Sequence, residues 1–152
     1  MEKEDVMDFE LSEEMRMLAD MAYKFAVKEI EPIAAEADEQ EHYTPEVRKK
    51  AGANGLIGSW IPEAYGGAGV GFLGNTIITE QLSRICMGIG LNIVAATFGC
   101  ENLLYYGTEE QKKTYMPPVC AGDTVCAGAY TEPNAGTDVA GYKTRAVADG
   151  AG

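Results

Sequence analysis

The feature that most constrains the fold of this chain is a set of apolar residues spaced three and four apart near its beginning. Ser12 suits the N-cap of a helix, and the two glutamates after it would occupy the first turn, where the helix dipole favours negative charge. The spacing predicts an amphipathic helix over 12–38 with its apolar stripe in the core. Pro32 lacks a backbone N–H, so we expect a kink near Glu31. The stripe consists of Met15, Leu18, Ala22, Phe25, Ala26 and Ile33.

Two more helices are predicted before the middle of the chain. Segment 45–54 begins with the N-cap and N1 pair Thr44-Pro45 and ends at Asn54-Gly55. Its basic run, 48–50, is expected to neutralise the acidic segment before it. Segment 72–85 has Glu80 and Arg84 four residues apart on its outer face. Its opposite side is apolar and contains Leu73, Ile77, Ile78, Leu82 and Ile85.

Two further helices are predicted in the second half. Segment 91–106 is apolar on nearly all sides, so we expect it to be the central and most buried helix, loosened or kinked at Gly99. The next helix begins at Thr108, which has the spacing of a capping box to Gln111. Pro117-Pro118 is expected to end regular helix early.

Three stretches are predicted to be extended. Residues 56–61 are typical of a buried, strand-like piece, 124–129 of a buried strand, and 142–148 of a second strand because polar and apolar residues alternate there. The polar, glycine-punctuated stretch 127–141 lies between the last two. Free backbone N–H groups beside hydroxyls in such a turn suit a pyrophosphate or the polar edge of a ring cofactor, and an ordinary structured turn is the alternative.

Composition excludes several classes of function. A chain of 152 residues with 46% hydrophobic and 24% charged residues has the size and balance of one soluble domain. Most of the net charge of -12 belongs to residues 1–46, and Lys and Arg are not clustered as a nucleic-acid partner would require. The chain has no apolar run of the length that crosses a bilayer and no start typical of a signal peptide. We therefore expect a soluble, intracellular protein without membrane insertion.

The cysteines and the single histidine do not form a metal-site pattern. Cys86, Cys100, Cys120 and Cys126 lie among apolar or small residues without CxxC spacing, which predicts buried free thiols rather than a zinc site or a disulfide framework. His42 has no partner in the sequence pattern and is expected on the surface or in a loop. No metal site is predicted.

Three separate passages resemble the acyl-CoA dehydrogenase family. The first is the run Ala129-Tyr130-Thr131-Glu132 followed by Gly136-Thr137-Asp138 and Gly141, in which only Tyr130 departs from the family's usual aliphatic residue. The second is Ile61-Pro62-Glu63-Ala64-Tyr65-Gly66-Gly67, and the third is 107–115, Gly-Thr-Glu-Glu-Gln-Lys-Lys-Thr-Tyr. Matches at three places along the chain are far more specific than a lone glycine motif.

The resemblance implies a mainly α fold, made of an N-terminal all-α domain over 1–122 and the opening strands of an incomplete middle β domain over 123–152. It implies FAD as cofactor, bound by Gly128, Ala129, Tyr130, Thr131, Gly136 and Thr137. The family's Ser/Thr at Thr137 also lies near the acyl-CoA. Val94 and Phe98 fall where members limit the depth of the acyl pocket, and plain core packing is the alternative for both.

The resemblance also implies a reaction, in which an acyl-CoA becomes the 2,3-enoyl-CoA by loss of the α proton to a carboxylate base and of a hydride to FAD. The family's base comes from its C-terminal domain, so no catalytic residue is assigned in this chain and the isolated chain is expected to be inactive. Glu132 is instead expected to brace its turn. Electron-transfer flavoprotein is the expected acceptor, and the full-length protein is expected to be a cytoplasmic homo-oligomer, a tetramer or dimer, or mitochondrial in a eukaryote.

Two alternatives stay open. Relatives of the family include acyl-CoA oxidases, nitroalkane oxidases and flavin monooxygenases, which keep the fold and change the acceptor or substrate. The other alternative is a non-enzymatic helical domain that binds partners or occupies an oligomer interface.

Overall fold

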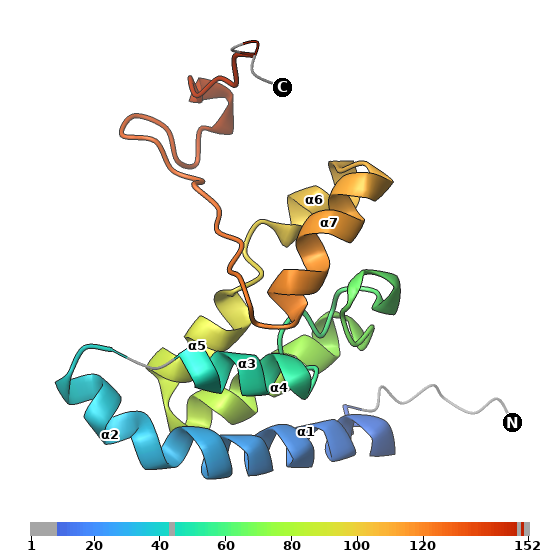
Figure 1. Ribbon diagram of the computed structural model, residues 1–152, viewed down its shortest axis with the longest axis vertical. Coiled ribbons are helices and arrows are strands. Elements are labelled where there is room, and N and C mark those ends of the chain that lie inside the picture. The colour runs from blue at the N-terminus through green and yellow to red at the C-terminus, as the bar shows by residue number, and fades with distance from the viewer. Residues whose placement is uncertain (1–8, 43–44, 149, 151–152) are drawn as a thin grey trace, which may run out of the picture.

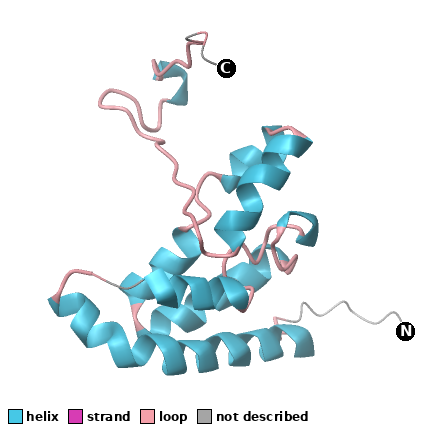
Figure 2. Ribbon diagram, in the orientation of Figure 1, coloured by secondary structure: helices cyan, strands magenta, loops and turns pink. Residues whose placement is uncertain are grey.

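The computed structural model describes residues 9–42, 45–148 and 150. The described residues form helices joined by turns and loops, with no strand among them (Figure 1, Figure 2), which confirms the mainly α fold class. The predicted N-cap Thr44 lies outside the described residues. The elements are α1 (Glu13–Phe25), the π-helical turn η1 (Ala26–Ile30), α2 (Glu31–Glu39), α3 (Pro45–Ala53), the 3-10 turn η2 (Glu63–Tyr65), α4 (Gly71–Ile85), α5 (Met87–Ala95), α6 (Cys100–Tyr106), α7 (Glu109–Cys120) and the 3-10 turn η3 (Val139–Gly141).

The first predicted helix forms as α1, η1 and α2, which follow one another as a single bent helix along one end of the molecule (Figure 1). Ser12 caps it by accepting the Met15 N–H at 3.2 Å. At the bend, the Glu31 N–H donates to the carbonyl of Ala26, five residues earlier, instead of four. This wider π turn lies directly before Pro32, so the interruption predicted there is confirmed.

The main core lies between this bent helix and α3, α4 and α5. The buried face of α4 consists of Gly74, Ile77, Ile78, Gln81 and Leu82. Leu73 lies at the edge of this face and is 59% exposed, contrary to the prediction that it belongs to the apolar side of the helix. The core cluster consists of Ala22, Phe25, Ala26, Ile30, Val47, Ala51, Leu56, Ile57, Ile78, Leu82, Ile89, Ile93, Val94 and Ala96, with Leu18 and Ile33 packed against it. The apolar stripe of the first helix therefore faces the core as predicted, except for Met15, which lies outside this cluster and lines a surface pocket.

A second cluster joins the segment after α3 to α6 and α7. It contains Trp60, Ile61, Cys100, Met116, Val119 and Cys120. Residues 56–61 are buried as predicted, but they form turns and bends instead of a strand, because no described strand lies beside them to complete a ladder.

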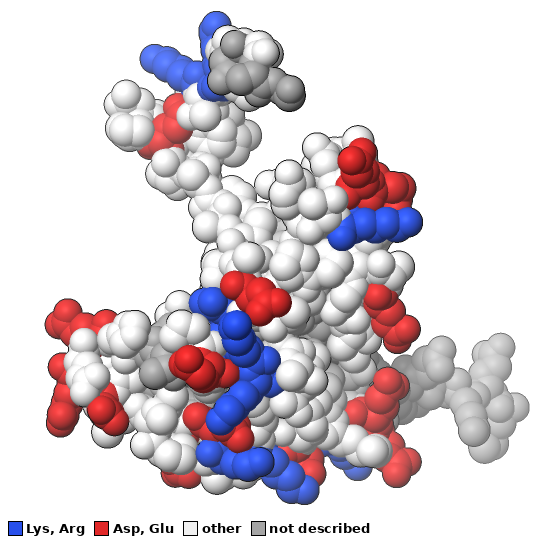
Figure 3. Space-filling model, viewed as in Figure 1, with Lys and Arg blue, Asp and Glu red and all other residues white. Residues whose placement is uncertain are grey.

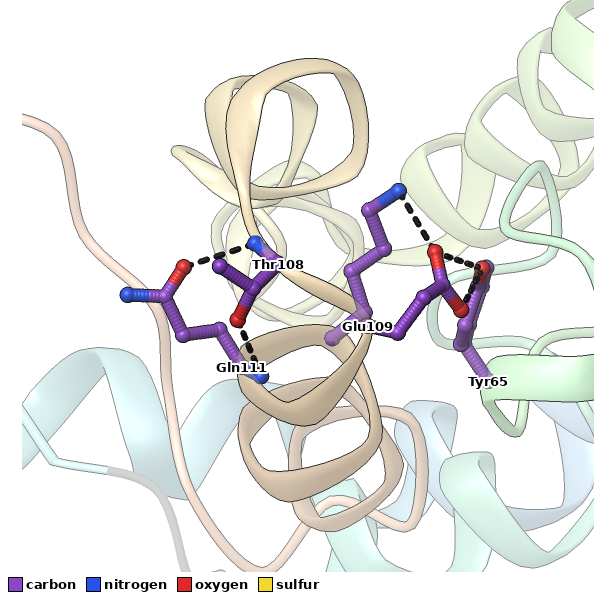
Figure 4. Close-up of polar contacts among 5 residues, drawn as sticks. Tyr65, Thr108, Glu109 and Gln111 are labelled. Carbon is purple, nitrogen blue, oxygen red and sulfur yellow. Dashed lines mark hydrogen bonds and ion pairs between the residues drawn. The ribbon is translucent and has the colours of Figure 1, made fainter.

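Helix α7 begins with the predicted capping box. The Thr108 hydroxyl accepts the Gln111 N–H at 3.2 Å, and the Gln111 side chain accepts the Thr108 N–H at 2.8 Å (Figure 4). The next residue, Glu109, accepts hydrogen bonds from the Tyr65 hydroxyl at 2.9 Å and from Lys112 Nζ at 3.0 Å. Lys112, and then Tyr65, hold the pKa of the Glu109 carboxyl below its ordinary value. The loop that carries Tyr65 is thus tied to the first turn of α7.

Two predictions about the second half of the chain are wrong. Segment 91–106 is interrupted at 96–99, between α5 and α6, so the disturbance predicted at Gly99 is confirmed. Leu91, Tyr105 and Tyr106 are exposed, however, so the segment is not the central, most buried helix. Pro117 and Pro118 do not end α7 early. The carbonyl of Pro117 accepts the Ala121 N–H at 2.9 Å, and the carbonyl of Pro118 accepts the Asp123 N–H at 3.0 Å. Burial of the neighbouring residues outweighs the loss of the two backbone N–H groups that the prolines lack.

The basic run of α3 connects it to two other elements. Lys50 pairs with Glu29 of the bent helix, as the sequence predicted, and this contact holds the pKa of Glu29 below its ordinary value. Lys49 pairs with Asp123 at 3.5 Å, and Arg48 Nε donates to the carbonyl of Gly122 at 2.9 Å. Figure 3 shows Lys and Arg side chains interleaved with acidic ones across this face.

In the described part of the chain, no helix has the length and apolar character needed to cross a membrane.

Two glycines of α5 give a matched test of this packing. A Cβ on Gly90 would lie 2.8 Å from the backbone carbon of Leu82 at the end of α4, whereas a Cβ on Gly88 would meet nothing within 4 Å. We expect Gly90→Ala to lower the free energy of unfolding by about 1–3 kcal/mol, because the helix backbones must separate. Gly88→Ala should raise it by up to about 1 kcal/mol, because alanine loses less entropy in a helix.

Urea denaturation of both variants and the parent chain measures the difference. Equal stability of the two alanine variants would contradict the close contact between α4 and α5.

Candidate functional site

The polar segment 124–144 leaves α7 and runs beside the break between α5 and α6. The Cys126 N–H donates to the carbonyl of Ala96 at 2.8 Å, and Cys126 and Thr97 form an isolated parallel bridge. Beyond this point the segment runs away from the helices (Figure 1). The break therefore holds the start of the segment that was predicted to bind the cofactor.

The shape of the break comes from Gly99 and Thr97. Gly99 has a φ of +100°, which only glycine adopts readily, and a Cβ there would lie 3.2 Å from the sulfur of Cys126. The Thr97 hydroxyl donates to the carbonyl of Val94 at 3.1 Å and accepts the Trp60 indole N–H at 3.4 Å. Trp60 in turn stacks on Phe72, with ring centroids 5.3 Å apart. The break is thus a supported feature of the fold and not a frayed helix.

The predicted strands 124–129 and 142–148 do not form. Thr124 and Val125 are exposed, Cys126 is half-buried, and residues 142–148 have no partner strand among the described residues. A single extended segment has no neighbouring strand to pair with its backbone N–H and C=O groups. It is therefore not a β-strand, even where polar and apolar residues alternate along it.

Glu132 closes the loop between these two stretches. Its carboxylate accepts the N–H of Lys143 at 2.9 Å, the N–H of Thr144 at 2.7 Å and the hydroxyl of Thr144. These contacts, the Thr144 hydroxyl first, hold the pKa of Glu132 below its ordinary value. The expectation that Glu132 braces its turn is confirmed, and these hydrogen bonds account for both of its carboxylate oxygens.

The loop presents unused donors at its far end. The Tyr142 hydroxyl donates to the carbonyl of Gly136 at 3.2 Å. The backbone N–H groups of Gly136 and Thr137 have no hydrogen-bond partner among the described residues. The methyl carbon of Thr131 lies 3.8 Å from where a Cβ of Gly136 would be, so two of the predicted cofactor contacts meet. Adjacent free N–H groups suit an anionic oxygen.

The other predicted residues lie nearer to the break. Gly128, Ala129, Tyr130 and Thr131 are exposed and extended, and the ring of Tyr130 folds back over Gly128. Val94 is buried in the main core, while Phe98 is 53% exposed at the break itself. Gly99, next to Phe98, lies against Cys126 and Ala127, so the predicted acyl and flavin segments come together there.

Sequence reasoning missed the residues that hold the break, namely Trp60, Thr97 and Cys126. Nothing in their local patterns signals a mutual contact, because they are far apart in the sequence.

The structure also shows a cavity of about 430 Å³ between α6, α7 and 124–126, lined by apolar groups and both Cys100 and Cys126. The described residues contain no cluster of metal-ligating side chains, and His42 lies in a separate surface pocket.

Comparison with known proteins identifies the family. Residues 12–123 match the family described as acyl-CoA dehydrogenase, N-terminal domain. The chain therefore belongs to the acyl-CoA dehydrogenase family. It is 42% identical over 145 residues to the short-chain specific acyl-CoA dehydrogenase of Clostridium acetobutylicum, a match that covers 95% of this chain and 38% of the relative.

Solved structures agree with this assignment. A chain in the structure of the electron transferring flavoprotein of Acidaminococcus fermentans superposes with a TM-score of 0.84 and 37% identity, over 95% of this chain and 38% of that one. The glutaryl-CoA dehydrogenase of Mycobacterium smegmatis in complex with FADH2 gives a TM-score of 0.81 and 27% identity, over 92% of this chain and 36% of that one. The chain thus spans well under half the length of these relatives.

The contacts of Glu132 predict how the loop responds to pH. The carboxylate stabilises the loop fully above the ordinary glutamate pKa of about 4.5. Because its pKa is lower in the folded loop, this stabilisation is lost as the pH falls below that value and through the lowered pKa. We expect the backbone amides of Lys143 and Thr144 to lose their protection from hydrogen exchange in that acidic range. In the Glu132→Gln variant, we expect the same two amides to lack this protection already at neutral pH.

Hydrogen exchange of these two amides measures the effect. Glu110→Gln, a change at an exposed glutamate of α7, is the matched control and should leave both amides unchanged. Full protection of both amides in Glu132→Gln would contradict the bracing role.

Proposed function

We propose that this chain is the N-terminal part of an FAD-dependent acyl-CoA dehydrogenase that oxidises an acyl-CoA thioester to the 2,3-enoyl-CoA. The observation that carries the proposal is the family match over 12–123 together with the loop that follows it, in which the N–H groups of Gly136 and Thr137 have no partner in the described part of the chain. The proposed domain boundary lies at 122/123, where α7 has ended and the chain leaves the helices.

The residues of the loop fit the cofactor. Gly136 and Thr137 would donate their N–H groups to the pyrophosphate, and the exposed backbone of 128–131 would line the ring system. Tyr130, the one departure from the family's pattern, folds over Gly128, so its contact with the ring would be made by the backbone. FAD, when bound, supplies the acceptor for the hydride that leaves the β carbon.

The proton chemistry in this proposal belongs to a carboxylate outside these 152 residues. Removing a proton α to a thioester requires a base and hydrogen bonds that stabilise the enolate oxygen. Glu132 does not suit the role of base, because its oxygens are occupied by Lys143 and Thr144 and its pKa is lowered. In the same proposal Thr137 contributes to the acyl-CoA site, and an electron-transfer flavoprotein reoxidises the full-length homo-oligomeric enzyme.

The test of this function uses the longer protein that contains the chain. Adding acyl-CoA without air should bleach the bound flavin and yield enoyl-CoA in equal amount. Bleaching that requires no acyl-CoA, or rapid turnover with oxygen as acceptor, would favour the oxidase or monooxygenase alternatives.

The chain by itself should be folded, colourless and inactive, because it carries only part of the flavin contacts and no base. Absorbance spectra after incubation with FAD and gel filtration measure binding, and an artificial electron acceptor measures turnover. Acyl-CoA-dependent reduction of the acceptor by the purified chain would overturn the assignment of the base to another part of the protein.

Phe98 is proposed to limit the depth of the acyl pocket. It is half exposed at the break, next to the residues that contact the cofactor segment. In the longer protein we expect Phe98→Ala to raise kcat/KM for longer acyl-CoA substrates relative to short ones, because the side chain removed is bulky. Tyr106→Ala, at an exposed aromatic residue at the end of α6, is the control. An unchanged ratio of kcat/KM across chain lengths in Phe98→Ala would contradict the role.

A further inference from the structure

Two cysteines meet where the cofactor segment joins the helices. Cys100, the first residue of α6, is fully buried, and Cys126 is half-buried and packs against the same cluster. Both line the cavity between α6, α7 and 124–126. The sulfur of Cys126 lies 3.2 Å from where a Cβ of Gly99, the residue before Cys100, would be.

The backbone holds this pair in place from both sides. Cys126 is anchored by its N–H to Ala96 at 2.8 Å and is bridged to Thr97, and the N–H of Cys100 donates to the carbonyl of Thr97 at 2.9 Å. Both cysteines are therefore attached to the same short turn. A disulfide needs two α carbons within about 7 Å and side chains that point toward each other, and a shared anchor favours that arrangement.

The other two cysteines do not line this cavity, although Cys120 belongs to the same buried cluster as Cys100. Cys120 is buried on α7, and its sulfur lies 2.7 Å from where a Cβ of Gly58 would be. Cys86 packs at the margin of the main core, in the other cluster. Of the four, Cys126 is the half-buried cysteine that lines a cavity together with the buried Cys100.

We propose that Cys100 and Cys126 form a reversible disulfide when the protein meets a disulfide oxidant such as glutathione disulfide. The Cys126 thiol loses its proton and attacks one sulfur of the oxidant, which releases one glutathione thiolate that takes up the proton. The Cys100 thiol then loses its proton and attacks the sulfur of Cys126, releasing the second glutathione. Two protein thiols are oxidised and one glutathione disulfide is reduced to two glutathione thiols.

The order of the two steps follows from the surroundings of each sulfur. Burial, and next to it the neighbouring Cys126, raise the pKa of the Cys100 thiol to about 12. A thiol that is deeply buried and rarely ionised does not start the exchange, so the more accessible Cys126 attacks first and Cys100 resolves the mixed disulfide.

Closure of this bond would fasten the start of the cofactor segment to α6. Cys126 lies two residues before Gly128, so the disulfide would add a covalent anchor beside the break to the backbone hydrogen bond from Cys126 to Ala96. We therefore expect the oxidised chain to hold 124–130 more tightly than the reduced chain.

The experiment oxidises the chain with glutathione disulfide, blocks free thiols by alkylation and digests it with trypsin without reduction. Cleavage at Lys112 and Lys113 separates Cys100 from Cys126, and tandem mass spectrometry assigns the sulfurs in the linked peptides. We expect a Cys100–Cys126 link with the loss of two hydrogen atoms, which disappears on reduction. Hydrogen exchange across 124–130 should become slower in the oxidised chain.

Matched variants separate this pair from general oxidation. Cys126→Ser should abolish the link and leave Cys100 reduced, whereas Cys86→Ser should leave the link intact, with circular dichroism confirming the fold of each. A Cys126 that stops at the glutathione adduct, a link to Cys86 or Cys120, or no oxidation of the parent chain would each overturn the proposal. The parent chain alone yields these outcomes, so the test does not depend on any variant folding.

Discussion

The arrangement of this chain depends on the break between α5 and α6 and on the hydrogen bond that Cys126 makes to it. A continuous helix over 91–106 would have satisfied the carbonyl of Ala96 internally and left the segment after α7 without an anchor. The left-handed Gly99 turns the chain, frees that carbonyl and leaves room for the sulfur of Cys126. One irregular turn thereby connects the main core, the second cluster and the proposed cofactor segment.

The main core and the second cluster are held together by a close backbone contact at a glycine and by a few polar contacts. A Cβ on Gly52 would lie 2.3 Å from the carbonyl oxygen of Ala121, so the end of α7 packs directly on the backbone of α3. Arg48 and Lys49 add contacts to Gly122 and Asp123 at the same place. The direction in which the chain leaves α7 is therefore set by α3, which comes much earlier in the sequence.

In the polar loop, some residues hold the shape of the loop and others are proposed to bind the cofactor. The Glu132 carboxylate accepts the backbone N–H groups of Lys143 and Thr144, and the Tyr142 hydroxyl donates to the carbonyl of Gly136. These bonds give the loop a defined shape although no strand lies beside it among the residues that the structure describes. The N–H groups of Gly136 and Thr137, which have no partner among the described residues, are those proposed to meet the pyrophosphate. The thiol pair lies at the other end of the segment, where a covalent bond would change its anchoring without touching those donors.

The sequence by itself determined the helices, most of their ends and the family, because these depend on local periodicity, on caps such as Ser12 and Thr108, and on short motifs. It indicated a disturbance of 91–106 at Gly99, but it did not determine the full division into two helices, the persistence of α7 through Pro117-Pro118 or the absence of strands in 124–148. Each of these is decided by contacts between distant residues. Trp60 and Cys126 shape the break, burial of Met116, Val119 and Cys120 carries α7 past its prolines, and a strand forms only where a neighbouring strand accepts its hydrogen bonds.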